Sequence, residues 1–430
     1  MNYLEEVITE FHKYPIPPLF KRELSIPADT DKVITVIGLR RTGKTYYLFQ
    51  IIQQLLDEGL DKKRIFYINF EDERLSELTT GELSTIVELY YKINPEADLL
   101  YLFFDEIQEI EGWEKFIRRL TEKKNVRIFL TGSSSKMLSQ EIATSLRGRT
   151  LSYNLFPLSL REFLVAKSFK PEFPLIESER GLLKRHLDEY LEYGGFPELL
   201  EYDRTVRIRT LKEYIDLMVY RDLVERYGIE KISALKFMIK SLVRNFAREL
   251  SVRKLGNYLL SAKVSLSHVK VYEYFSYLVD INFIFLIRKY GKGVREVEGS
   301  IPKIYLVDHG FVILHGIEDR ERRIENIVAT ELLRKKHYFD PILEIYYWKE
   351  TSGIEVDFVL AQGHGVKQLI QVCYDIEDIK TKERELKSLV KSSKELECKN
   401  LLVITWDYEA KEDFKGSNIE FVPLWKWLLG

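Results

Sequence analysis

Eight consecutive residues have the types and spacing that suit binding of a phosphate chain. They are Gly38-Leu39-Arg40-Arg41-Thr42-Gly43-Lys44-Thr45, and they match G-x-x-x-x-G-K-[ST] at every specified position. An apolar run precedes them and an amphipathic segment beginning at Tyr46 follows, as this motif requires. Glycine permits backbone conformations in which successive amide groups converge on a phosphate at a helix N-terminus. We therefore predict that these residues and Tyr46 bind a nucleoside triphosphate, with Lys44 on the β- and γ-phosphates and Thr45 on Mg²⁺.

Two adjacent acids, Asp105 and Glu106, end another apolar run. At the carboxyl end of a buried parallel strand, both carboxylates would face the crevice in which such sheets bind ligands. Asp105 is predicted to hold Mg²⁺, and Glu106 is predicted to polarise the attacking water as a general base.

Further polar and basic residues could complete this site. Thr131 or Ser133 could hydrogen-bond the γ-phosphate or the water, although hydroxyls at such a position also cap helices. Arg147 or Arg149 could stabilise phosphoryl charge in a neighbouring subunit of a homo-oligomer, or could be surface arginines. Arg40 and Arg41, inside the phosphate-binding loop, could contact phosphate or could instead pair with acids of a lid.

Apolar runs that alternate with helical segments predict an α/β fold. Continuous apolar runs, rather than alternating ones, indicate strands covered on both faces, and hence a parallel sheet flanked by helices. The runs are residues 33–37, 65–70, 99–104, 126–131 and 150–156. One complete strand separates the two motifs in the sequence, as in ATPases that add a strand between their Walker strands.

Composition limits the classes of partner. Lys and Arg number 65 against 67 Asp and Glu, so no bulk charge would draw the chain to nucleic acid or membrane. Two cysteines in 430 residues favour a reducing cytoplasm over a disulfide framework. No apolar stretch approaches the ~18 residues that span a bilayer, so no membrane contact is expected.

These motifs, with Tyr193-Gly194-Gly195-Phe196-Pro197-Glu198, resemble a prokaryotic and especially archaeal family of P-loop ATPases similar to AAA+ and STAND proteins. Many members carry a C-terminal domain related to restriction-endonuclease folds. The resemblance implies ATP as the nucleotide and a helical lid in which Pro197 packs on the adenine. A helix breaker between two lid helices explains the same residues equally well.

The predicted domains are a P-loop AAA+ core of ASCE type at 1–157, a helical lid at 158–235, a winged helix at 236–307 and a nuclease-like domain at 308–430. In the winged helix, residues 250–260 and 267–279 form two helices, and 281–289 and 302–307 form a hairpin. The second helix would contact DNA or dock a protein through residues near its start, which are Ser267, His268, Lys270 and Tyr272. Nearby cations that could meet phosphates are Lys263, Arg288, Lys289, Lys292 and Arg295.

The last domain looks like a PD-(D/E)xK nuclease fold that has lost part of its site. Asp357 fits the first acid, but the second acid and the lysine are replaced by Gln371-Val372-Cys373. Glu325 or Glu331 could compensate only in part, and Cys373 is expected to be inert core. We expect a DNA- or partner-binding scaffold rather than an active nuclease.

Together these features predict a Mg²⁺-dependent ATPase that couples its nucleotide state to an interaction with DNA or a protein. The alternatives are a nucleotide-gated switch with negligible turnover and an ATP-controlled nuclease.

Overall fold

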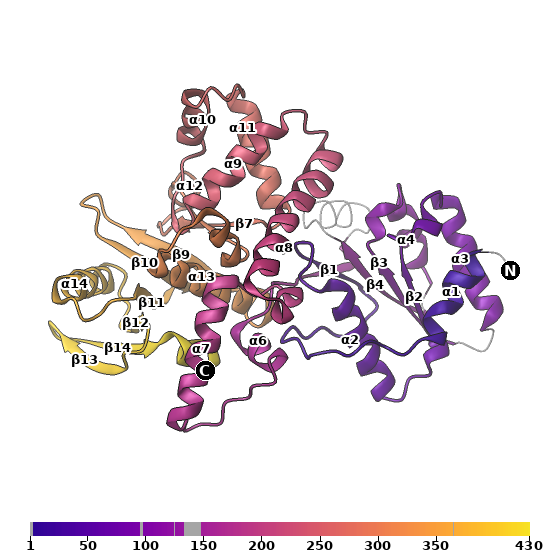
Figure 1. Ribbon diagram of the computed structural model, residues 1–430, viewed down its shortest axis with the longest axis horizontal. Helices are drawn as coiled ribbons and strands as arrows, with labels where there is room; N and C mark the ends of the chain where they lie inside the picture. The colour runs from indigo at the N-terminus through magenta and orange to yellow at the C-terminus, as the bar shows by residue number, and fades with distance from the viewer. Residues whose placement is uncertain (1–2, 95–97, 124, 133–147, 364) are drawn as a thin grey trace. The chain divides into compact units, whose positions relative to one another are not determined.

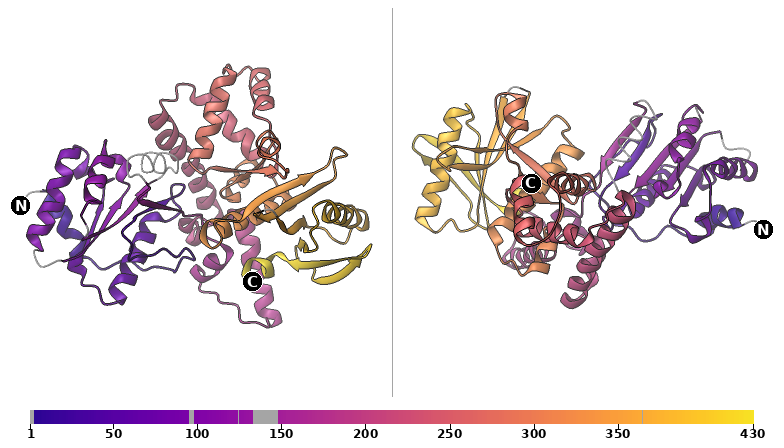
Figure 2. Two further views of the ribbon diagram at one scale, coloured as in Figure 1. Left: turned by 180° about the vertical axis from the view of Figure 1, so that it is seen from behind. Right: turned by 90° about the horizontal axis from the view of Figure 1, so that it is seen from above.

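The computed structural model describes residues 3–94, 98–123, 125–132, 148–363 and 365–430 (Figures 1 and 2). The chain forms two compact units. Unit 1 contains Met1–Phe156 together with Asp280–Asn282, and unit 2 contains Pro157–Val279 and Phe283–Gly430. None of the helices formed by these described residues is both long enough and apolar enough to cross a membrane.

Unit 1 is built on a five-stranded parallel sheet, which confirms the predicted P-loop α/β fold class. The strands are β1 (Val33–Ile37), β2 (Ile65–Asn69), β3 (Leu100–Asp105), β4 (Val126–Gly132) and β5 (Thr150–Asn154). Their order in the sheet is β2-β3-β4-β1-β5, and every pairing is parallel. The strand that separates β1 from β3 in space is therefore β4, whereas β2, which separates the two motifs in the sequence, lies at the edge.

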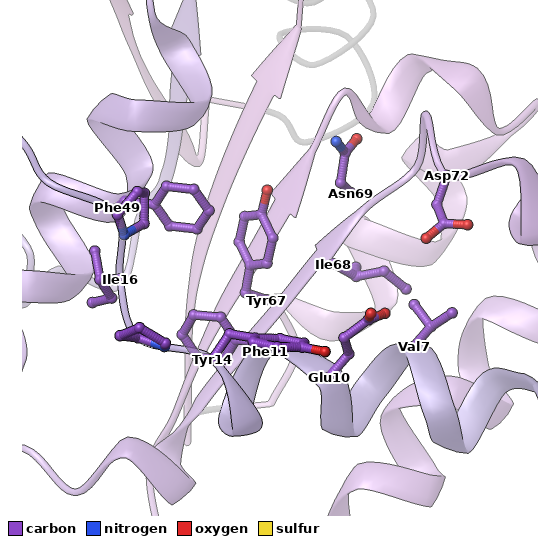
Figure 3. A pocket seen from close by; sticks show the side chains of 12 residues that line it. Val7, Glu10, Phe11, Tyr14, Ile16, Phe49, Tyr67, Ile68, Asn69 and Asp72 are labelled. Carbon is purple, nitrogen blue, oxygen red and sulfur yellow. The ribbon is translucent and has the colours of Figure 1, made fainter.

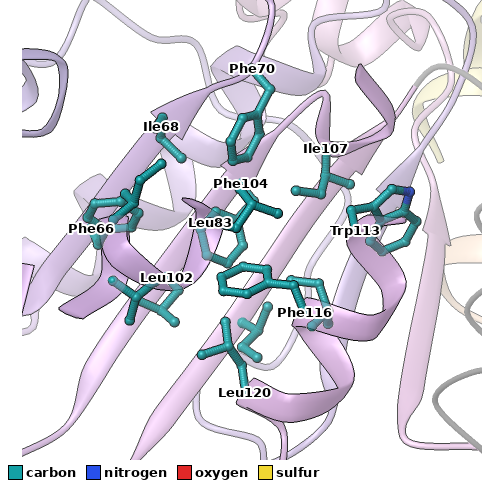
Figure 4. Packing of buried hydrophobic residues seen from close by; sticks show 14 of the residues in the cluster. Phe66, Ile68, Phe70, Leu83, Leu102, Phe104, Ile107, Trp113, Phe116 and Leu120 are labelled. Carbon is teal, nitrogen blue, oxygen red and sulfur yellow. The ribbon is translucent and has the colours of Figure 1, made fainter. Parts of the chain in front are cut away.

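Helices cover both faces of this sheet. They are α1 (Tyr3–Lys13), α2 (Lys44–Asp57), α3 (Thr80–Ile93) and α4 (Trp113–Leu120), with short 3₁₀ turns η1 (Lys62–Arg64), η2 (Glu73–Leu75) and η3 (Ile107–Glu109). Side chains alternate along a strand, so Leu102 and Phe104 of β3 pack in one core with Leu83 and Phe116 of α3 and α4 (Figure 4). Phe103 stacks instead on Phe129 of β4, with ring centroids 4.5 Å apart. Packing on both faces thus fixes β3 and the two acids at its end.

Unit 2 begins with helices, as the sequence predicts for residues 158–235. These are α6 (Leu160–Ala166), α7 (Glu177–Tyr193), η4 (Pro197–Glu201), α8 (Arg204–Leu217) and α9 (Ile232–Arg244), and the π-helix η5 (Met218–Glu225) continues α8. The later helices are α10 (Val252–Ser261), α11 (His268–Asp280), α12 (Val294–Glu298), η6 (His309–His315), α13 (Arg320–Tyr338), α14 (Ile379–Glu395) and α15 (Leu424–Leu429).

A nine-stranded mixed sheet runs through the rest of unit 2. Its strands are β6 (Arg248–Glu249), β7 (Ile284–Lys289), β8 (Lys303–Leu306), β9 (Glu344–Lys349), β10 (Glu355–Gln362), β11 (Gly365–Cys373), β12 (Leu401–Thr405), β13 (Ala410–Phe414) and β14 (Ser417–Pro423). Their order is β13-β14-β12-β11-β10-β9-β7-β8-β6. Because β7 pairs in parallel with β9, strands from both sides of the boundary predicted at residue 307 belong to one sheet.

The turn after α7 has a structural reason for its paired glycines. Gly194 has φ 79° and ψ −162°, a conformation that side chains other than hydrogen rarely allow. Gly195 donates its N–H to Oδ2 of the buried Asp308 at 2.7 Å, and a Cβ at Gly194 would lie 1.8 Å from Oδ1 of the same carboxylate. The glycines therefore let the backbone approach Asp308 closely.

Candidate functional site

The phosphate-binding loop joins β1 to α2, and its conformation depends on its two glycines. Gly43 precedes α2 in the left-handed region, with φ 94° and ψ 28°. At Gly38 an added Cβ would lie 2.4 Å from the carbonyl oxygen of Leu155, so only glycine fits beside β5 without a shift. Thr42 donates its hydroxyl to the Leu39 carbonyl at 2.9 Å, which closes the loop.

Lys44 is the first residue of α2, and its side chain is buried. Its Nζ lies 3.3 Å from the Gly38 carbonyl oxygen and 3.4 Å from Oε1 of Glu106. The ammonium group therefore lies between the loop and the end of β3, where a phosphate chain bound in the loop would meet it.

Asp105 is fully buried and is held by three hydroxyl groups. Thr131 donates to Oδ1, Tyr67 donates to Oδ2 at 3.0 Å, and Thr45 forms a further side-chain hydrogen bond. Burial and the charge of Glu106 raise the pKa of Asp105 to about 6, while these hydrogen bonds oppose the rise.

Glu106 has φ 52°, which turns its side chain toward Lys44. Its N–H donates to the Thr131 hydroxyl at 2.9 Å, and Gln108 donates its side-chain amide to Oε2. Burial alone would raise the pKa of Glu106, but the charges of Lys44 and Arg40 lower it below its ordinary value. Glu106 is therefore ionised at neutral pH, whereas the pKa of Asp105 lies closer to neutrality.

These residues fit a triphosphate and its metal ion. The Thr45 hydroxyl and the Asp105 carboxylate are hard oxygen donors in contact with one another, as magnesium prefers. The loop has the two glycines that close approach of backbone to phosphate requires, and the buried ammonium of Lys44 supplies positive charge.

Comparison with known proteins agrees with this geometry. Residues 30–164 match a family model described as an AAA domain. Residues 184–321 and 321–427 match two domains of unknown function, DUF8612 and DUF4143. The chain is 38% identical over 419 residues to the uncharacterized protein MJ1544 of Methanocaldococcus jannaschii, covering 96% of this chain and 91% of that protein.

The chain belongs to the AAA+ family of P-loop ATPases.

A second relative of this AAA+ protein is an uncharacterized protein of Haemophilus influenzae, which is 28% identical over 93% of this chain and 95% of its own length. Among solved structures, ORC1 of Aeropyrum pernix in complex with DNA is 13% identical, with a TM-score of 0.29 over 77% of this chain and 92% of that one. AMPPCP-bound DnaA of Aquifex aeolicus is 17% identical, with a TM-score of 0.25 over 58% and 79%. These TM-scores are too low to support any functional argument.

The AAA+ protein brings most of its predicted site residues together in unit 1. The cluster contains Gly38, Leu39, Thr42, Gly43, Lys44, Thr45, Asp105, Glu106 and Thr131. In the described arrangement Thr131 bonds both acids, and whether it also senses phosphate stays a prediction.

The other predicted residues are placed differently. Arg40 pairs with Glu71 at 2.6 Å, while Arg41, Tyr46 and Arg149 are exposed. Ser133 and Arg147 lie outside the described residues. Pro197 belongs to unit 2, where it begins η4, so its contact with adenine stays a prediction.

Three residues of the AAA+ protein were missed by the motifs. Arg22 donates to the carbonyl of Thr42 at 2.9 Å and to that of Phe156 at 2.6 Å, which fixes the loop from behind. Gln108 contacts Glu106, and Tyr67 contacts Asp105. The sequence could have indicated Tyr67, because it places a phenol within the apolar strand β2. No local pattern identifies Arg22.

Tyr67 also lines a cavity of about 240 Å³ beside the site (Figure 3). Its ring lies 4.9 Å from that of Phe49 and 5.5 Å from that of Phe11, measured between centroids. The remaining lining comes mainly from α1 and the proline-bearing segment after it. Packing on one side and Asp105 on the other therefore hold Tyr67 in place.

The predicted contact residues of the second unit lie around the start of α11. Ser267 accepts the Lys270 N–H at 3.3 Å, and Lys270 pairs with Glu273 at 2.8 Å. Val269 and Tyr272 are 68% and 52% exposed. The surface at this helix start is therefore as apolar as it is basic.

Of the nuclease-like residues, Cys373 is buried in an apolar cluster, where burial raises its pKa to about 12. This environment gives no means of activating the thiol. Glu331 pairs with Arg334 on its own helix. Asp357 and Glu325 contact a lysine that the motif did not predict.

Proposed function

We propose that this AAA+ protein is a Mg²⁺-dependent ATPase that uses its nucleotide state to control an interaction with DNA. The observation that carries the proposal is the convergence of Lys44, Asp105 and Glu106 in one buried cluster at the carboxyl ends of β1 and β3. A triphosphate needs a cation and a metal ligand, and its hydrolysis needs a base beside them. This cluster contains all three types of group.

Each side chain then has a distinct task. Lys44 exchanges its contacts with the Gly38 carbonyl and Glu106 for phosphate oxygens. Asp105 acts as a carboxylate with the Thr45 hydroxyl beside it, and Glu106, released from Lys44, accepts a proton from the attacking water. A bound magnesium ion would supply the positive charge that stabilises the phosphoryl oxygens.

Nucleotide affinity and turnover of three variants test this proposal. Lys44→Ala is expected to lose both ATP binding and hydrolysis. Glu106→Gln is expected to retain binding but lose turnover by roughly 10²- to 10⁴-fold, because an amide cannot act as the base. Binding is measured by calorimetry with a non-hydrolysable analogue, and turnover by phosphate release.

Lys115→Ala is the matched control, because Lys115 is an exposed lysine on α4. Unchanged turnover in Glu106→Gln would contradict the assigned base. Binding by the native chain without turnover under any condition would favour a nucleotide-gated switch.

Arg149→Ala in the same assay tests the proposed arginine finger. If Arg149 acts on a neighbouring subunit, turnover per subunit in the native chain rises with protein concentration.

For the interaction with DNA we propose a winged helix formed by α9, β6, α10, α11, β7 and β8. Support comes from the order of these elements and from β8, which pairs antiparallel with both β6 and β7. In this fold α11 is the reading helix. DNA binding that weakens with salt, and further in Lys270→Glu, is the expected result by fluorescence anisotropy.

Turnover that responds to no duplex or single strand would exclude DNA as the regulator. The exposed Val269 and Tyr272 would then favour a protein as the partner.

A further inference from the structure

Part of unit 2 has the topology of a metal-dependent nuclease core. In chain order it contains α13, β9, β10, β11, α14 and β12, with antiparallel pairing from β9 to β11 and a parallel β12. A cleft of about 770 Å³ opens over this sheet. Glu325 of α13 and Glu355 and Asp357 of β10 line the cleft. These are the elements from which such a fold would present its metal-binding acids.

A lysine side chain occupies the centre of this acid group. Lys303, from β8, places its Nζ 2.9 Å from Oε1 of Glu325, 2.5 Å from Oε1 of Glu355 and 3.0 Å from Oδ1 of Asp357. The Lys303 side chain is 3% exposed. The ammonium group of Lys303 therefore contacts one oxygen of each of three carboxylates, which come from α13 and β10. In an ordinary buried ion pair, the ammonium group contacts one carboxylate.

Two of the three remaining carboxylate oxygens also have partners. Val372 donates its N–H to Oδ2 of Asp357 at 3.0 Å, and Lys349 pairs with Oε2 of Glu355 at 2.9 Å. Tyr305 donates to the same oxygen of Glu325 that Lys303 contacts, at 2.7 Å.

A magnesium ion does not fit these residues. It needs about six oxygens at roughly 2.0–2.1 Å, in positions that the ammonium and its hydrogen bonds already use. Gln371, where the nuclease pattern has an acid, accepts from the Asp357 N–H at 3.3 Å and donates to Glu385 at 2.6 Å. Among the residues that the structure describes, no group of three or more His, Cys, Asp or Glu side chains is arranged to hold a metal ion.

We propose that the ammonium group of Lys303 is the permanent cation of this cleft and takes the position that a divalent metal ion has in nucleases of this topology. The acids then serve to bind β8 to α13 and β10, and the cleft cannot perform metal-dependent cleavage. Burial alone would lower the pKa of Lys303, but the charges of Glu325, Asp357 and Glu355 raise it well above its ordinary value. Lys303 therefore remains charged.

Removing the ammonium should convert the acid group into a metal site. Free Mn²⁺ is measured by electron paramagnetic resonance without nucleotide, and the native chain is compared with Lys303→Met. Lys303→Met is expected to bind one more Mn²⁺ per chain than the native chain does. Its affinity for this ion should be at least tenfold higher than that of any Mn²⁺ site that Asp357→Asn removes from the native chain. Lys303→Met/Asp357→Asn is expected to lose that site again.

Lys349→Met is the matched control, because Lys349 contacts Glu355 but neither Glu325 nor Asp357. It should gain no site. Mn²⁺ held by the phosphate-binding loop is common to all variants, so the difference is independent of the proposed ATPase activity.

Two outcomes would overturn the proposal. One is a Mn²⁺ site, or metal-dependent DNA cleavage, that the native chain has and Asp357→Asn lacks. The other is a folded Lys303→Met variant, judged by circular dichroism, that gains no site. If Lys303→Met does not fold, the comparison of the native chain with Asp357→Asn needs no lysine variant and can still overturn the proposal.

Discussion

Asp105 and Glu106 are neighbours in the chain, yet their surroundings shift their pKa values in opposite directions. Asp105 has hydroxyl groups around it but no cation among its named partners, and burial raises its pKa to about 6. Glu106 faces Lys44 and Arg40, which lower its pKa despite complete burial. At the scale of single residues, this difference fits the roles proposed for the two acids, Asp105 as metal ligand and Glu106 as general base.

Tyr67→Phe tests how Asp105 is prepared for metal binding. The ring packing on Phe49 and Phe11 is preserved, but the hydrogen bond that lowers the pKa of Asp105 is lost. We expect the affinity for Mg²⁺-nucleotide to fall about tenfold, corresponding to one hydrogen bond to a charged group. Calorimetry measures it. Tyr14→Phe, at an exposed tyrosine of the same cavity, should bind as the native chain does, and equal affinity of both variants would disprove the role of Tyr67.

His309 predicts a defined contribution to pH-dependent stability. Burial, with Arg323, lowers its pKa to about 3, and its Nε2 donates to the Tyr190 carbonyl at 2.6 Å. The unfolded chain binds a proton near pH 6.5 and the folded chain does not, so this contribution is complete above pH 6.5 and is lost as the pH falls.

Relative to His309→Gln, the native chain should lose about 2 kcal/mol of unfolding free energy between pH 7 and pH 5. Urea unfolding of both proteins measures the difference, in which the other titrating groups cancel. A difference that is constant with pH would show that His309 has the same pKa in the folded and the unfolded chain.

At the scale of elements, the sequence was sufficient where one short segment determines the structure. The parallel strands were predictable because each is a bounded apolar run, and the loop was predictable because its glycines and Lys44 lie within eight residues. Contacts across long separations were not predictable. Arg22 reaches Phe156, and Lys303 reaches Asp357 54 residues later, so neither contact leaves a local pattern. The two-residue strand β6 is too short to show any period.

The turn after α7 gives a prediction about an element boundary. Gly194→Ala should destabilise unit 2 by about 3 kcal/mol, because the new Cβ would overlap the Asp308 carboxylate and the backbone is strained for alanine. Gly181→Ala, at an exposed position within α7 that has nothing within 4 Å, should instead stabilise it by about 0.5–1 kcal/mol. Chemical denaturation measures both. Equal changes in the unfolding free energy for Gly194→Ala and Gly181→Ala would show that the turn does not require glycine.

At the scale of the whole molecule, each unit has its own apolar core, so we expect two unfolding transitions by calorimetry. A non-hydrolysable nucleotide with Mg²⁺ should raise the midpoint of the unit 1 transition. At 100 times Kd the added stability is about 2.7 kcal/mol. Lys44→Ala should abolish this shift. A shift of equal size in both transitions would show that the units unfold together.

The short segment Asp280–Asn282 gives the two units an unusual covalent relationship. The chain leaves unit 1 after Phe156, returns to it after Val279 and leaves it again after Asn282. Within unit 1, Asn282 donates its side-chain amide to Asn154 at the end of β5, at 3.0 Å. A fragment that ends at Phe156 would therefore lack the side chain that donates to Asn154, and unit 1 is complete only when the segment from far along the chain is present.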